Sequence, residues 1–407
     1  TRDLNAASGW GGSSYTGTRA AAPFNILDAI YEAKTAIAAV DTDVNFPLLQ
    51  VFWSVNNVPT SGDVTLGQIG TSSYTRTNGV PTIRILGDEN NDTDEYDDHV
   101  IVHEFGHYFE DQLSRSDSPG GSHSLSNRLD SRLAFGEGWG NAFSGMILGD
   151  PNYRDAGGAQ QSTGFSFSVE SDLTSSTGPR FEGWYNEASV QQLLYDLFDS
   201  TNDGTDTISG GLAPLYNAFT DPNYINAVNF TTIFEFANRV RTEAAINATT
   251  FDAMLAAEDI NTTDPRGVGE TNDGALPQTL PLFNVVTVGG GAVNVCSTAV
   301  NGETNKHGVR EFITFTLATT GPLTMTATET SGPATTTDPD FIIWERGLVF
   351  TSDSRGQDRR AFSGLDGTET WTGTLDAGTY AIEIYDCNNA SCGAAAAGDS
   401  CFDFTVN

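Results

Sequence analysis

The motif His103-Glu104-Phe105-Gly106-His107, an H-E-x-x-H pattern, constrains this chain more than any other feature. Histidines four residues apart lie on one face of an α-helix, so both imidazole rings can bind the same metal ion. Glu104 lies beside that pair, in the place of a general base for a metal-activated water. Apolar residues between Ile101 and Phe109 give the helix a side to bury. The pattern predicts a buried helix, within Asp97–Asp111, that binds a zinc ion.

A zinc ion at a reactive site needs a third protein ligand and an open fourth position. The metzincin pattern would place glycine at 110 and histidine or aspartate at 113. The chain has Glu110 and Leu113 instead, which excludes that class. The stretch Phe-Gly-Glu-Gly-Trp-Gly-Asn at 135–141 offers a glutamate on a second helix, and we expect Glu137 to be the third ligand.

The second helix has a distinctive composition. Trp139, Phe143 and Ile147 recur every four residues, which predicts its buried stripe. A glycine inside a helix costs about 1 kcal/mol relative to alanine, so its several glycines indicate that another backbone passes close by. The helix of the H-E-x-x-H motif is the simplest neighbour. Asn141 follows Glu137 by one turn, and we expect its side chain to hold the second nitrogen of a ligand histidine.

The spacing from His103–His107 to Glu137-Gly138-Trp139 resembles the gluzincin metallopeptidases, the group of thermolysin and fungalysin. Those enzymes have an edge strand, an Asn-Gly turn and a Gly-Asp stretch upstream, and this chain has similar residues at 70–74, 78–79 and 83–88. The resemblance covers residues 48–199, about a third of the chain. It implies an α+β, thermolysin-like domain with two lobes, a small mixed sheet and a helical lobe.

The resemblance also implies zinc-dependent hydrolysis of peptide bonds. Zinc would be held by His103, His107 and Glu137. Glu104 would take the proton of the attacking water and pass it to the leaving amine. In these enzymes a tyrosine, histidine or arginine of the second lobe stabilises the oxyanion, and Tyr185 is our first candidate for that role.

A protein or peptide is the expected substrate. The edge strand, with Ser72, Ser73 and Tyr74, would pair with an extended substrate through backbone hydrogen bonds. We favour an endopeptidase. The alternative is an aminopeptidase of the same clan, which usually has a Gly-x-Met-Glu-Asn stretch, and Gly87-Asp88-Glu89-Asn90 matches that stretch poorly.

An acidic segment precedes the metal-binding helix. Oxygen-bearing side chains alternate at Asp88, Asn90, Asp92 and Asp94, as in a calcium loop. The segment lacks the central glycine and the distal glutamate of an EF-hand. An acidic helix entrance, with Asp94 as the N-cap, is the alternative. Calcium is a candidate second cofactor beside this alternative.

The charge of the chain restricts its partners. Its 407 residues have a formal net charge of −34 and include only two lysines, Lys34 and Lys306. So acidic a surface argues against binding nucleic acid or anionic membranes, and no apolar run reaches the length of a membrane span. The chain starts at Thr1 without a signal peptide. We expect a mature, secreted, bacterial protein that has lost its signal and propeptide, and a monomer.

All four cysteines lie late in the chain, at 296, 387, 392 and 401. An even number confined to one β-rich region predicts two disulfides formed in an oxidising compartment. Three pairings are possible. We expect Cys387–Cys392 across a short loop and Cys296–Cys401 between the ends of the region.

The C-terminal region predicts a second fold. Residues 261–281 are rich in Pro, Gly, Asn and Thr, and beyond them apolar residues alternate with a period of two, which predicts a β-sandwich at 285–407. Its segments 312–317, 338–344 and 377–380 resemble the bacterial pre-peptidase C-terminal domain, a module that is typically appended to secreted peptidases. Residues 1–280 would form the metallopeptidase domain, with an α/β lobe at 1–125 and a mainly helical lobe at 126–280.

A function without catalysis is the remaining alternative. A zinc-stabilised adhesion or binding protein could use its C-terminal sandwich to bind a partner. A structural zinc site needs no general base, so the presence of Glu104 favours an enzyme.

Overall fold

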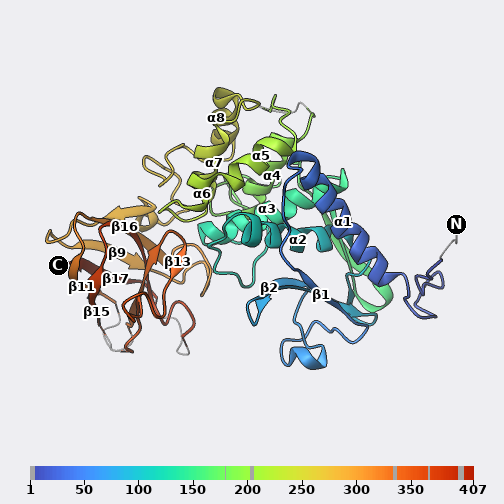
Figure 1. The fold of residues 1–407 in the computed structure, drawn as a ribbon, viewed down its shortest axis with the longest axis horizontal. Helices are drawn as coiled ribbons and strands as arrows, with labels where there is room; N and C mark the ends of the chain where they lie inside the picture. Colours follow the sequence, from blue (N-terminus) through green and yellow to red (C-terminus); the bar gives the residue numbers. More distant parts are fainter. Residues whose placement is uncertain (1–4, 179, 202–205, 333–336, 365–366, 393–397) are drawn as a thin grey trace. The chain divides into compact units, whose positions relative to one another are not determined.

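A computed structural model describes residues 5–178, 180–201, 206–332, 337–364, 367–392 and 398–407. The chain, whose helices and strands are labelled in Figure 1, divides into two compact units. Unit 1 comprises Thr1–Ser114, Glu137–Leu173 and Gln191–Phe219, and unit 2 comprises Arg115–Gly136, Thr174–Val190 and Thr220–Asn407. Each unit combines segments from distant parts of the chain, and the domain bounds expected at 1–280 and 285–407 stay a prediction.

The helices and strands have the following bounds. The helices are α1 Ala22–Val40, α2 Asp98–Leu113, α3 Ser131–Leu148, α4 Glu187–Phe198, α5 Leu212–Thr220, α6 Pro222–Ile225, α7 Ile233–Val240 and α8 Ala248–Ala257, with short 3-10 turns at Val64–Leu66, Ala159–Gln161 and Pro277–Thr279. The strands are β1 Gln50–Trp53, β2 Ser73–Thr77, β3 Val80–Ile85, β4 Gly87–Asp88, β5 Asp92–Thr93, β6 Asn152–Gly157, β7 Thr163–Ser168, β8 Phe283–Val285, β9 Val293–Ser297, β10 Arg310–Leu317, β11 Gly321–Ser331, β12 Pro339–Glu345, β13 Leu348–Val349, β14 Arg360–Ala361, β15 Thr368–Leu375, β16 Gly378–Asp386 and β17 Ser400–Val406. Among the described helices, none combines the length and the apolar composition that crossing a bilayer would require.

Unit 1 contains the small sheet expected from the sequence. Its strand order is β1-β3-β2, with β1 parallel and β2 antiparallel to the central β3. Tyr74 of β2 is opposite Ile83 of β3, whose side chain is fully buried. Strand β2 therefore forms one edge of this sheet within the described chain. The edge strand expected at 70–74 corresponds to β2, which is displaced by a few residues toward the Asn78-Gly79 turn.

The sequence analysis missed a hairpin in unit 1. Residues 152–168 form β6 and β7, which pair antiparallel with Tyr153 opposite Phe167 and Asp155 opposite Phe165. They continue the sheet β4-β5-β6-β7, in which Asp92 is opposite Gly157. Gly, Ser and Thr are prevalent in this segment, and the sequence analysis assigned no strand to it. Exposed small polar residues along a hairpin do not prevent pairing when aromatic side chains alternate on one face.

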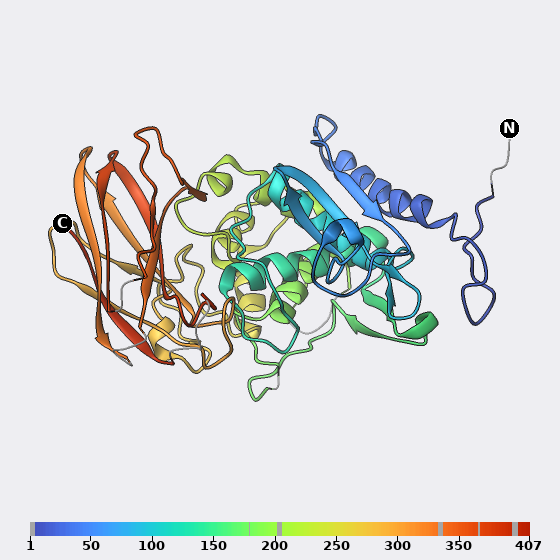
Figure 2. The same ribbon diagram turned by 90° about the horizontal axis from the view of Figure 1, so that it is seen from below.

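The β-sandwich of unit 2 is confirmed (Figure 2). One sheet has the order β13-β12-β16-β10-β8 and the other β15-β11-β17-β9, with β14 paired to β12. Their inward-facing residues share one core that includes Ile313, Met325, Phe341, Ile382 and Phe404. Alternation of apolar and polar residues places one side of each strand in this core.

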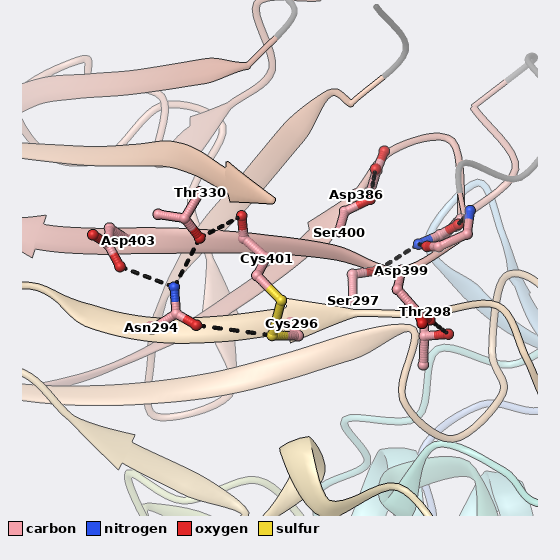
Figure 3. The surroundings of a disulfide bond; sticks show 12 residues. Asn294, Cys296, Ser297, Thr298, Thr330, Asp386, Asp399, Ser400, Cys401 and Asp403 are labelled. Carbon is pink, nitrogen blue, oxygen red and sulfur yellow. Dashed lines mark hydrogen bonds between the residues drawn. A yellow bond between two sulfur atoms is a disulfide. The ribbon is translucent and has the colours of Figure 1, made fainter. Parts of the chain in front are cut away.

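Both disulfides are confirmed as expected, between Cys387 and Cys392 and between Cys296 and Cys401. Figure 3 shows that Cys296–Cys401 joins the neighbouring strands β9 and β17, where the two residues are opposite each other. Asn294 extends this cross-strand bonding by donating to Asp403 Oδ1 at 2.9 Å and Thr330 Oγ1 at 3.0 Å. The bond closes a loop of 105 residues, so it restricts the unfolded chain over nearly the whole sandwich.

A buried charge network connects the sandwich to an earlier segment of unit 2. Arg132 donates to Asp130 Oδ2 at 2.8 Å and to Glu383 Oε2 on β16 at 2.9 Å. Arg310 donates to the other oxygen of Glu383 at 2.7 Å. Burial alone would raise the pKa of Glu383, but the two arginines outweigh it and lower the pKa. The sandwich thus shares buried contacts with residues far upstream of the segment 261–281.

This network predicts a large effect of Glu383→Ala on stability. Removing one partner of a buried ion pair leaves uncompensated charge, so the free energy of unfolding of unit 2 should fall by about 3–5 kcal/mol. Asp358→Ala is the control, since Asp358 pairs with Arg360 at the surface and its loss should cost less than about 1 kcal/mol. Chemical denaturation followed by circular dichroism measures both losses. Equal losses in the two variants would contradict the role of the buried network.

Candidate metal centre

The histidine pair is presented by α2. Within α2, His103 and Glu104 are buried, as are Ile101, Phe105 and Phe109 on the predicted apolar side. The structure brings His103, His107 and Glu137 together into one group of potential metal ligands. All three belong to unit 1, and Glu137 comes from α3.

The three donor atoms form a nearly equilateral triangle. His103 Nε2 lies 3.0 Å from His107 Nε2 and 3.2 Å from Glu137 Oε2, and His107 Nε2 lies 3.3 Å from the same carboxylate oxygen. Ligands of a tetrahedral zinc ion, bound at 2.0–2.1 Å, are separated by about 3.3 Å. Two imidazole nitrogens and one carboxylate oxygen are also the donor types that zinc prefers. The residues therefore fit a zinc ion in both chemistry and spacing.

Asn141 holds His103 in the orientation that metal binding requires. Gln191 Nε2 donates to the carbonyl oxygen of Ser168 at 3.5 Å, so its Oε1 is free to accept from Asn141 Nδ2 at 3.0 Å. Asn141 Oδ1 then accepts from His103 Nδ1 at 2.9 Å. This chain of hydrogen bonds places the proton of His103 on Nδ1 and directs the lone pair of Nε2 toward the other two ligand atoms.

Close contact between α2 and α3 makes this arrangement possible. A Cβ atom on Gly140 would lie 2.7 Å from His103 Cε1, and one on Gly106 would lie 3.3 Å from the Cα of Gly140. Trp139 Nε1 donates to the carbonyl oxygen of Gly106 at 3.1 Å. The sequence-based prediction that the glycines admit the H-E-x-x-H helix is confirmed. The predicted single stripe is too narrow, because α3 is buried on all sides from Ser131 to Met146.

Carboxylates surround the second histidine. Glu110 Oε2 lies 3.7 Å from His107 Nδ1, on the side of the ring away from Glu137. Burial alone would lower the pKa of His107, but Glu137, Glu110 and Glu104 outweigh it and raise the pKa well above its usual range. The same negative charge favours a divalent cation at this position.

The expected substrate residues lie at the edge of the small sheet. Ser73 and Tyr74 belong to β2 and Ser72 immediately precedes it. The hydroxyl group of Tyr74 donates to Asp111 of α2, which also receives two hydrogen bonds from Arg76 at 2.7 and 2.8 Å. These bonds connect the edge strand β2 to α2 within unit 1.

Tyr185 lies in unit 2, where its side chain is buried. Its hydroxyl group is 2.9 Å from the carbonyl oxygen of Glu182 and 3.0 Å from Asn272 Oδ1, and its ring stacks on His307. Burial raises the pKa of Tyr185 to about 12, so the phenol stays protonated at neutral pH. Its role at an oxyanion stays a prediction.

The structure separates the four expected calcium ligands into two pairs. Asn90 N donates to Asp88 Oδ1 at 3.0 Å, which closes the turn between β4 and β5. Asp92 and Asp94 instead converge with Asp155 of β6. The helix α2 has Asp97, not Asp94, at its N-cap position.

Three residues near the centre were missed by the sequence analysis. Glu110 could have been found, because it follows His107 by three residues on the same helix face. Tyr153 lies on the missed hairpin, with its ring 6.1 Å from that of His103. Burial, Asp155 and Glu104 raise the pKa of Tyr153 well above its usual range. Gln191, fifty residues from its partner Asn141, had no sequence signal.

Comparisons with known proteins match two parts of the chain. Residues 71–259, which include His103, His107 and Glu137, match the family model of the Mycolysin C-terminal domain. This match relates that segment to a peptidase-associated domain. No curated protein matches the chain.

Three similar solved structures each cover 31% of this chain. The pre-peptidase C-terminal domain of collagenase from Bacillus anthracis has 10% identity and a TM-score of 0.21, with 94% of that chain covered. CorA, a surface-associated copper-binding protein of Methylomicrobium album BG8, has 12% identity, a TM-score of 0.21 and 96% coverage. PliG, a periplasmic lysozyme inhibitor of Aeromonas hydrophila, has 18% identity, a TM-score of 0.17 and 99% coverage.

The close contact between the helices predicts that Gly140→Ala weakens zinc binding. The new methyl group would displace the His103 ring, so zinc affinity should fall by at least about tenfold. Gly145→Ala is the matched control in the same helix. Its methyl group would meet Val169 Cγ2 at 2.9 Å and Tyr195 Cε2 at 3.0 Å, and neither residue is a ligand. Zinc content in graded chelator concentrations measures the affinity, and an unchanged value in Gly140→Ala would contradict the prediction.

Proposed function

We propose that this chain is a secreted zinc-dependent peptidase, and that His103, His107 and Glu137 hold the zinc ion. The triangle of their donor atoms, with edges of 3.0–3.3 Å, is the observation that carries the proposal. The similarity of residues 71–259 to the Mycolysin C-terminal domain supports it. The two disulfides of the sandwich support an oxidising, extracellular location.

Zinc at this position would supply a Lewis acid that polarises the scissile carbonyl group and lowers the pKa of a water molecule. Glu104 follows the first ligand on α2, and its charge acts on both His107 and Tyr153. A buried carboxylate at this point can take a proton from water and deliver it to the leaving amine. Asn141 keeps His103 oriented through both steps.

The substrate would bind along β2. The position of β2 at the edge of its sheet leaves one side of its backbone for an extended peptide. The side chains of Ser72 and Tyr74 are engaged with Asp94 and Asp111, so backbone groups would make most of the contacts. Recognition through the backbone suits an endopeptidase, which must accept a chain that continues in both directions. For the residue that stabilises the oxyanion, we propose Tyr185.

Two variants test the mechanism. Glu104→Gln removes the base but no ligand, so it should keep one zinc ion per chain and lose most of its turnover, by about 10²-fold or more. Glu137→Gln removes a charged ligand and should lower zinc content itself. Zinc per chain after dialysis and cleavage of peptides with a blocked N-terminus measure the two properties.

Each outcome distinguishes between the candidate functions. Substantial turnover in Glu104→Gln would exclude Glu104 as the base. Unchanged zinc in Glu137→Gln would assign the third ligand elsewhere. Cleavage of free peptides alone would identify an aminopeptidase, and a zinc-loaded protein without cleavage of any peptide or protein would favour a binding function.

A further inference from the structure

A second group of potential metal ligands lies apart from the histidine pair in unit 1. It consists of Asp92 on β5, Asp94 just after that strand, and Asp155 on β6. One carboxylate oxygen of each residue lies within 4.8 Å of the others. The group therefore draws on two segments about sixty residues apart, and the second is the missed hairpin.

Two oxygens of this group are buried without a hydrogen-bond donor in the described structure when both carboxyl groups are ionised. They are Asp92 Oδ1 and Asp94 Oδ1. Asp94 is only 3% exposed, and its other oxygen accepts a hydrogen bond from the hydroxyl group of Ser72. A buried carboxylate oxygen without a donor carries a large desolvation cost. A bound cation would satisfy both oxygens at once.

The charge around the group is negative. Asp88 is opposite Asp92 across the β4–β5 pair, and Asp97 immediately precedes α2. Burial raises the pKa of Asp94, and Asp92, Asp155 and Asp97 raise it further. The pKa values of Asp92, Asp94, Asp97 and Asp155 are all raised. Among the described residues, no arginine, lysine or histidine lies where it would lower these pKa values appreciably.

The arginine that binds the adjacent Glu95 is already paired. Arg19 donates to Glu95 Oε1 at 2.5 Å and to the carbonyl oxygen of Gly87 at 2.6 Å. Arg19 and Glu95 are both buried, and their opposite charges offset each other. This pair therefore supplies no net positive charge to the neighbouring aspartates.

We propose that Asp92, Asp94 and Asp155 bind a calcium ion. All three ligands are carboxylates, and hard oxygen donors without nitrogen or sulfur select Ca²⁺ or Mg²⁺ over transition metals. Ca²⁺ tolerates a flexible arrangement of oxygen ligands, whereas Mg²⁺ demands a nearly ideal octahedron. Ligands drawn from two separate segments, at the end of one strand and within another, suit the more tolerant ion. The proposal differs from the calcium loop expected at 88–94, because Asp88 and Asn90 are replaced by Asp155.

The site would join three parts of unit 1 that position the zinc centre. Asp97 is the N-cap residue of α2. Its side chain accepts a hydrogen bond from the backbone N of Ala156 at 2.9 Å, which links the helix to β6. Ser72 donates to Asp94 and accepts from the backbone N of Leu86 at 2.9 Å, which links the start of β2 to the end of β3. Calcium would thus stabilise the start of the metal-binding helix and the edge strand together.

Calcium binding to the full chain, loaded with zinc, tests the proposal. We expect a site with a Kd at or below about 1 mM, measured by isothermal titration calorimetry, and a rise in melting temperature that the same concentration of Mg²⁺ does not produce. Asp94→Asn and Asp155→Asn should each weaken calcium binding by about tenfold or more. Asp88→Asn is the matched control, because it removes a neighbouring charge but no proposed ligand. It should bind calcium nearly as the wild type does.

The sign of the change in melting temperature separates a calcium site from a cluster that holds no cation. With calcium, Asp94→Asn should melt below the wild type, and without calcium it should melt at or above it, because one repelling charge is gone. The same shift under both conditions would overturn the proposal. The proposal would also be overturned by a wild type whose melting temperature does not depend on calcium, by tighter binding of Mg²⁺ than of Ca²⁺, or by an equal loss of calcium affinity in Asp88→Asn.

If the asparagine variants do not fold, Asp155→Glu keeps the charge and must still change calcium affinity. Zinc content is measured in parallel, so a failure of the zinc proposal is recognised separately.

Discussion

The metal centre depends on the close approach of two helix backbones. Three ligands for one ion must come from α2 and α3, and side chains of ordinary size between the helices would hold His103 and Glu137 too far apart. Gly106 and Gly140 remove that obstacle, and the ring of His103 occupies the space where a side chain on residue 140 would lie. Each glycine weakens its own helix by about 1 kcal/mol, and in α3 the burial of Trp139 and Phe143 offsets that loss. The packing of the two helices therefore sets the distances between the proposed ligands, and their side chains supply the donor atoms.

The proposed ligands could be located in the sequence because helix geometry fixes their positions locally. A spacing of four residues places His103 and His107 on one face whatever the rest of the chain does. Glycines in an otherwise apolar helix indicate a crowded neighbour, which the structure confirms at Gly140. The alternating pattern after residue 285 predicted the sandwich for the same reason, since successive side chains of a strand point to opposite faces of its sheet. These features share one property, that a few neighbouring residues determine them.

The features that could not be predicted depend on distant pairs. Asp155 joins Asp92 and Asp94 only after the hairpin 152–168 has paired with β5, and that hairpin was hidden by its glycine-rich and serine-rich composition. Gln191 orients Asn141 across fifty residues, and nothing near either residue indicates the contact. The composition at 261–281 suggested a domain boundary. The buried bonds of Arg132 to Glu383 show that residues on both sides of that stretch belong to one unit. Composition reports local flexibility, whereas a compact unit is defined by its long-range contacts.

Buried charge is stabilised in two different ways in this protein. In unit 2, Arg132 and Arg310 face Asp130 and Glu383, so opposite charges and hydrogen bonds compensate for burial. In unit 1, Asp92, Asp94, Asp97 and Asp155 face one another, and each has a raised pKa. Such a group must take up protons or bind a cation to remain buried. A chain with a net charge of −34 gains more from the cation, because a divalent ion removes repulsion that extends beyond its own ligands. If calcium binds to this acidic group, α2 would be most stable where the surrounding calcium concentration is high.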